Sequence, residues 1–72
     1  MDIEILQRHL VQAEYHAAES MRLVAQQEEL VAGLKQRGLG TADAAKVLDA
    51  LRDAQTVHEQ DIQFLRTKLG FT

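Results

Sequence analysis

Residues 38–41 read Gly38-Leu39-Gly40-Thr41, and they mark the one place where a long helical pattern ends and a second one begins. Gly38 has no Cβ, so it can take the left-handed conformation that closes many helices. Leu39 and Leu34 then fall at two positions that often make an apolar contact at such a helix end. Thr41 is expected to be the N-cap of the following helix. A connection this short leaves the helices as antiparallel neighbours, and the stretch therefore predicts an all-α hairpin.

The composition indicates one small helical domain over residues 1–72. It contains no Pro and few Gly, which favours helices, and no Cys, which excludes disulfides and thiolate chemistry. The basic residues are scattered singly and the net charge is −3, which argues against a nucleic-acid partner. The longest uninterrupted apolar runs are triplets, far short of a membrane span. We therefore expect a cytoplasmic protein that binds neither nucleic acid nor membrane.

The two helical patterns cover residues of about 2–37 and 42–69, and each carries a seam of residues spaced alternately three and four apart. Such spacing is typical of coiled coils. The seam of the first helix is Ile3, Leu6, Leu10, Ala13, Ala17, Ser20, Val24, Gln27, Val31 and Leu34. The seam of the second helix is Ala44, Leu48, Leu51, Gln55, His58, Ile62, Leu65 and Leu69. Folding the chain about Leu39 places opposite each other residues whose numbers add up to about 79.

Ser20, Gln27, Gln55 and His58 interrupt both seams at mid-length. One interpretation is that the middle of the seam is wet or partly exposed. The other is a polar layer that determines register and oligomeric state, which is a known use of such residues. The sequence does not decide between the two.

Further apolar residues make each helical stripe wider than one partner helix can cover, and exposed apolar surface of this kind marks a partner site. We therefore expect a homodimer in which two hairpins form a four-helix bundle. The first helix is also the longer one, so that Ile3, Ile5 and Leu6 are expected to project past the second. The predicted oligomer interface consists of Ile3, Leu6, Leu23, Leu30, Val47, Val57 and Phe64.

Histidines and carboxylates are the residues best able to carry chemistry. His16 and Glu19 are three apart, as are His58 and Asp61, and the antiparallel register places His16 opposite Asp61 and Glu19 opposite His58. Metal sites in helical bundles use carboxylates with a Glu-x-x-His motif. Here the order is reversed, which favours half-exposed polar residues over a metal site. These four residues are the metal-ligand candidates, and no catalytic or cofactor-binding residue is predicted.

The chain resembles a family of small bacterial helical-hairpin proteins with no assigned activity, and the resemblance covers most of its length. It rests on His9-Leu10, Gln12-Ala13-Glu14, His16, Gln27, Leu30-Val31, Leu34, Gly38, Thr41, Ala45, Leu48 and His58. The resemblance implies no function. It does suggest that His9, His16 and His58 have a role.

From the residues alone, we expect a non-enzymatic interaction module that associates with itself and could also dock a helix of another protein. The alternative is a metal-binding bundle built on the histidine and carboxylate candidates.

Overall fold

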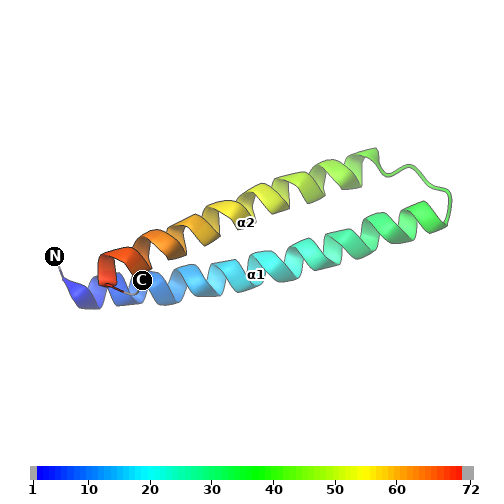
Figure 1. Ribbon diagram of the computed structural model, residues 1–72. Coiled ribbons are helices and arrows are strands. Elements are labelled where there is room, and N and C mark those ends of the chain that lie inside the picture. The colour runs from blue at the N-terminus through cyan, green and yellow to red at the C-terminus, as the bar shows by residue number, and fades with distance from the viewer. Residues whose placement is uncertain (1, 71–72) are drawn as a thin grey trace.

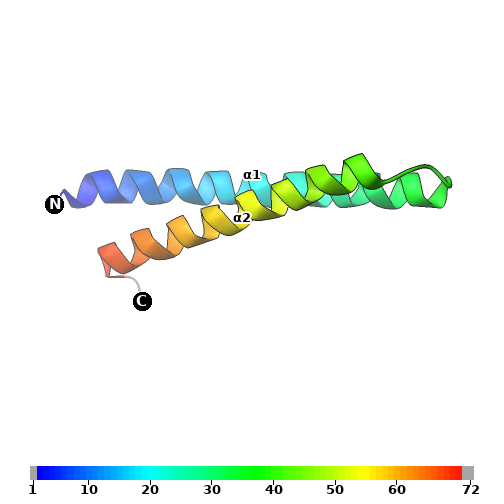
Figure 2. The same ribbon diagram turned by 90° about the horizontal axis from the view of Figure 1, so that it is seen from above.

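The computed structural model describes residues 2–70 and contains two helices, α1 (Ile3–Gln36) and α2 (Ala42–Leu69). They pack against each other as an antiparallel hairpin of 54 × 17 × 14 Å, with no strand among the described residues (Figure 1). Seen from above, α2 crosses α1 at a shallow angle (Figure 2). The all-α hairpin predicted from the sequence is confirmed. Within residues 2–70, neither helix combines the length and the apolarity needed to span a membrane.

The start of α1 is determined by Asp2, whose Oδ1 accepts a hydrogen bond of 2.9 Å from the main-chain N–H of Glu4. This bond satisfies one of the N–H groups that a helix leaves without a partner at its first turn. The N-terminal part of α1 extends past the end of α2 (Figure 2). Ile3 and Ile5 are accordingly exposed, whereas Leu6 is already partly buried.

The loop between the helices has the geometry that its glycine predicts. Gly38 has a φ of 71°, in the left-handed region. The N–H of Leu39 donates to the carbonyl oxygen of Leu34 at 2.9 Å, and the N–H of Gly38 donates to Lys35 at 3.1 Å. These two bonds form a Schellman motif, which satisfies the last carbonyl groups of α1. Thr41 is the N-cap residue of α2, but its side chain makes no capping hydrogen bond.

The helix α2 also ends at a glycine in the left-handed conformation, Gly70, which has a φ of 85° and follows Leu69 directly. The main-chain N–H of Gly70 donates to Thr67 at 3.2 Å. The same pattern at a helix end predicts that Phe71 folds back toward Leu65, but this contact lies outside the described residues.

The core lies along the predicted seams. Its buried members are Leu10, Ala17, Ser20, Val24 and Leu48. The remaining seam residues are partly buried, except for Ile3, which is 61 % exposed because it lies beyond the end of α2. The hairpin thus covers only one narrow stripe of each helix, and the wider apolar surface stays in contact with solvent.

Candidate functional site

The two long edges of the hairpin differ in chemistry, and the first is held by ion pairs between the helices. Glu14 on α1 accepts from Arg66 on α2 at 3.2 Å, and Glu28 accepts from Arg52 at 3.1 Å. In both pairs the residue numbers add up to 80, in agreement with the predicted register. All four side chains are about half exposed. We call this side the charged edge.

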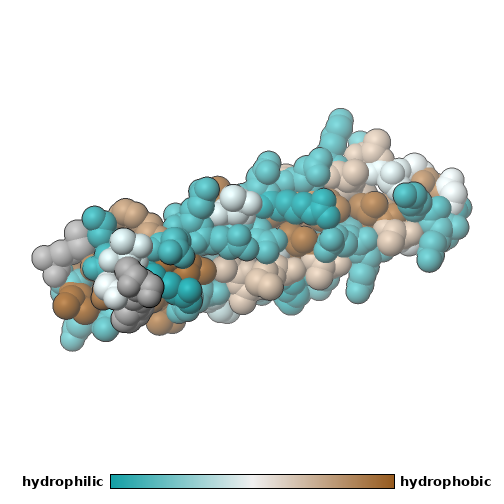
Figure 3. Space-filling model, in the orientation of Figure 1, coloured by the Kyte–Doolittle hydropathy of each residue, from teal (hydrophilic) through white to brown (hydrophobic). Residues whose placement is uncertain are grey.

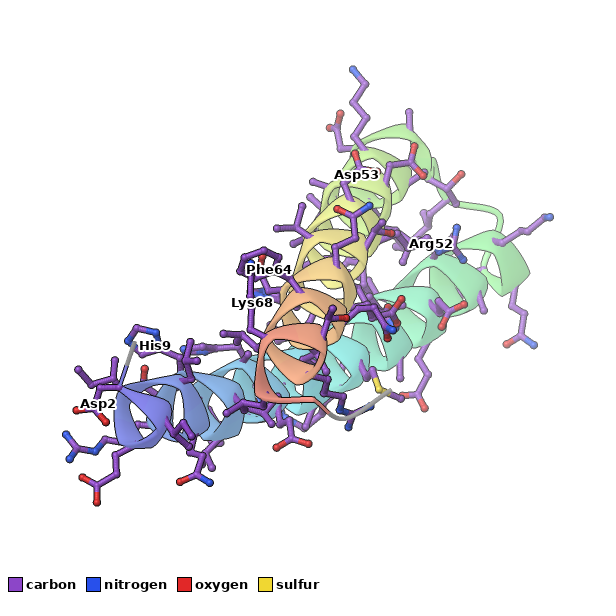
Figure 4. The ribbon with its side chains drawn as sticks, turned by 60° about the vertical axis from the view of Figure 1, so that its left-hand side comes forward. Asp2, His9, Arg52, Asp53, Phe64 and Lys68 are labelled. Carbon is purple, nitrogen blue, oxygen red and sulfur yellow. The ribbon has the colours of Figure 1, made fainter. Side chains whose placement is uncertain are left out.

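The charged edge also carries one large exposed side chain, Met21, midway between Glu14 and Glu28, whereas the opposite edge carries several large apolar side chains. On a helix with 3.6 residues per turn, these residues lie on the other flank of each seam from the ion-paired residues. Phe64 and Lys68 accordingly project from one side of α2, and Arg52 from the other (Figure 4). We call this side the apolar edge, and its members are Leu23 and Leu30 on α1 and Val47, Ala50, Ala54, Val57 and Phe64 on α2.

The large side chains of the apolar edge are between 40 % exposed at Leu23 and 60 % exposed at Phe64. Five of the seven residues predicted to form an oligomer interface lie here, namely Leu23, Leu30, Val47, Val57 and Phe64. The other two do not join them, because Ile3 lies at the far end of α1 and Leu6 is a partly buried member of the seam. Hydrophobic residues also reach the surface between hydrophilic side chains on the face seen in Figure 3.

A hollow of about 390 Å³ opens on the same side, near the free ends of the helices. Its lining residues are His9, Gln12, Ala13, His16, His58, Asp61, Phe64 and Leu65. Within it, the rings of His16 and His58 stack with their centroids 5.9 Å apart and an interplanar angle of 25°. Tyr15 meets His16 edge-on, with centroids 5.8 Å apart. His9 projects on the same side as Phe64 and Lys68 (Figure 4).

Three of the four metal-ligand candidates line this hollow, and the fourth does not. His16, His58 and Asp61 line the hollow. Glu19 instead binds Arg22 one helical turn away, with its carboxylate oxygens 2.7 and 3.0 Å from Nη2. The hydrogen bonds that Arg22 donates to Glu19, and then the negative charge of Glu19, raise the pKa of Arg22.

The predicted pairing of Glu19 with His58 is therefore wrong, because a cation on the same helix lies within easier reach of the carboxylate. Among residues 2–70, no three His, Cys, Asp or Glu side chains come close enough together to hold a metal ion. The stacking of the two imidazoles is the feature that sequence reasoning missed. A signal for it existed, since Ser20 and His58 are opposite each other in the register and His16 is one turn from Ser20.

Comparison of the chain with protein-family models, with curated proteins and with solved structures found no match. The resemblance drawn from the sequence therefore stays a prediction, and the surface of the hairpin carries the functional argument.

Proposed function

We propose that this protein is a non-enzymatic, cytoplasmic interaction module that associates with a second copy of itself through the apolar edge. The observation that carries the proposal is the contrast between the two edges. The charged edge is closed by two ion pairs between the helices, whereas the apolar edge leaves five large apolar side chains half in water.

Exposure of this kind costs free energy that a second copy can recover. Fully burying a Leu, Val or Phe side chain gains about 1.5–3 kcal/mol relative to leaving it exposed. The five large side chains of the apolar edge are about half exposed, so roughly half of that gain remains available at each of them. A symmetric dimer would bury these side chains on both copies. Contiguous apolar surface along the length of a small protein usually marks an interaction site.

The test is light scattering of the purified protein at micromolar concentration, with two matched variants. Leu30→Glu places a charge on the apolar edge, and we expect it to shift the protein toward monomer. Glu28→Gln removes a charge from the opposite edge and should leave the oligomeric state unchanged. A wild-type protein that stays monomeric across the micromolar range would refute the proposal, as would equal effects of the two substitutions.

A further inference from the structure

We infer that the second copy packs through α2 against α2, antiparallel, so that the two loops lie at opposite ends of a four-helix bundle. This inference rests on the proposed self-association and specifies how the two copies meet. It comes from the exposed side chains of α2, which follow a heptad spacing of their own.

A second seam runs along α2, displaced around the helix from the seam that packs on α1. Its members are exposed and alternate in spacing by three and four residues, which is the spacing one partner helix requires; Asp61 occupies the position between Val57 and Phe64, and the other members are apolar. They are Val47, Ala50, Ala54, Val57 and Phe64. The same spacing continues at both ends into charged residues, with Asp43 before Val47 and Lys68 after Phe64. We call this row, from Asp43 to Lys68, the outer line of α2.

The outer line is complementary to itself when it is reversed. If Ala54 faces Val57 of the second copy, the same register places Val47 opposite Phe64, a β-branched residue against a ring. Such pairs of a small and a large side chain allow close packing between helices. Because the dimer is symmetric, every pair occurs twice.

The charges at the two ends fit the same register. Asp43 then lies opposite Lys68 of the second copy, which pairs an anion with a cation at each end of the interface. Lys68 is already on this side of α2, with its Nζ 5.3 Å from the centroid of the Phe64 ring (Figure 4). Asp61 lies within the row and falls opposite Ala50, so that its carboxylate faces a small side chain and not another anion. Complementary charges of this kind select the orientation of partners more than they add affinity.

Other orientations fit less well. Packing α2 against α2 in parallel would place Lys68 next to Lys68 and Asp43 next to Asp43, and like charges side by side oppose association. Packing α2 against α1 of the second copy with the loops together follows the same register of about 80 and brings Asp61 to the level of Glu19. Two carboxylates would then face each other, and like charges oppose association.

Leu23 supports the antiparallel register from the other helix. The hairpin places it level with the midpoint of the outer line, between Ala54 and Val57. The two copies of Leu23 therefore approach each other near the two-fold axis. The dimer then covers the exposed part of the Leu23 side chain as well.

The experiment uses introduced cysteines. Because the chain contains no cysteine of its own, every disulfide that forms must join the introduced ones. Val47→Cys and Phe64→Cys chains are mixed and mildly oxidised, and each variant is also oxidised separately. We expect the mixture to give several-fold more cross-linked dimer than either variant alone. Thr56→Cys, on the exposed outer side of α2, is the control and should cross-link poorly. Circular dichroism checks that each variant is helical.

A spin label on Gly40→Cys gives an independent distance, since a Cβ at this loop position meets nothing within 4 Å. The antiparallel arrangement puts the two loops about 50 Å apart, at 1.5 Å per residue on either side of the axis. Labels close together in a protein that dimerises would overturn this inference and leave the proposed self-association standing. Absence of self-association by light scattering would overturn both.

Discussion

The side-chain amide of Gln27 on α1 donates a hydrogen bond of 3.0 Å to the main-chain carbonyl oxygen of Ala44 on α2. Gln27 is a member of the seam and is partly buried, so the bond is shielded from solvent. It joins the two helices three residues into α2, close to the loop. Because this bond joins one particular residue of α1 to one particular residue of α2, it helps to determine the register in which α2 lies on α1.

We expect Gln27→Ala to lower the free energy of unfolding by about 1 kcal/mol, since a typical intramolecular hydrogen bond contributes about 0.5–1.5 kcal/mol net. Gln26→Ala is the control, because Gln26 is exposed and precedes Gln27 directly. It should change the free energy by no more than about 0.5 kcal/mol. Urea unfolding of both variants measures the difference. Equal losses would show that the amide bond does not contribute to the hairpin.

Gly38 and Gly40 provide a matched pair in the loop. Added Cβ atoms meet nothing within 4 Å at either position, but only Gly38 has a positive φ, of 71°. We therefore expect Gly38→Ala to destabilise the fold by about 1–2 kcal/mol, the cost of a left-handed conformation for a residue with a Cβ. Gly40→Ala should be neutral or slightly stabilising, because alanine restricts the unfolded chain. Thermal melts decide the matter, and similar melting temperatures for the two variants would contradict the argument.

The sequence was sufficient to predict the hairpin because its signals are local. The glycine at position 38 and the alternating spacing of the seams depend only on neighbouring residues, and α2 runs from Ala42 to Leu69 as predicted. The seam residues are buried or partly buried as expected, with Ile3 as the exception. That five of the predicted interface residues share one edge could be found in the same way, since helical periodicity determines on which flank of the seam each residue lies.

The polar contacts could not be predicted, because several partners were within reach of each side chain. Glu19 had His58 opposite it and Arg22 on the next turn, and the structure shows the bond to Arg22. Gln55 donates to Glu59 on its own helix at 3.2 Å, although its position in the seam suggested a role between the helices. Spacing identifies which side chains are neighbours, but the choice among them depends on rotamers that spacing does not determine.

The charged edge should contribute little stability, and that contribution should depend on salt. A double-mutant cycle with Glu28→Gln and Arg52→Met is expected to give a coupling of about 0.2–1 kcal/mol, as is usual for exposed pairs. At 1 M salt the screening length falls to about 3 Å, so the coupling should decrease markedly. The measurement is urea unfolding of the four proteins at low and high salt. A coupling that does not change with salt would mean that the pair is less exposed in solution than in the structure.

Zinc should leave the melting temperature unchanged. The carboxylate of Glu19 is bound by Arg22, and no group of three metal-binding side chains exists among residues 2–70. A ligand that binds only the folded state would raise the melting temperature. Thermal melts of untagged protein with and without zinc provide the check, with His58→Gln as the companion variant. A rise in melting temperature that His58→Gln abolishes would support the alternative of a metal-binding bundle.

The last prediction concerns Ser20, which is 5 % exposed and whose hydroxyl has no hydrogen-bond partner in the structure. A buried hydroxyl without a partner costs about 1–3 kcal/mol. Ser20→Ala removes the hydroxyl and keeps the Cβ atom that packs in the seam. We therefore expect it to raise the free energy of unfolding by about 1 kcal/mol. Ala17→Ser is the reciprocal variant, since Ala17 is the preceding seam residue and is also buried. It should lower the free energy by a similar or larger amount. Urea unfolding compares both variants with the wild type. If Ser20→Ala instead destabilises the protein, the hydroxyl is bonded in solution, and the polar positions of the seam would then form a layer that helps to determine register.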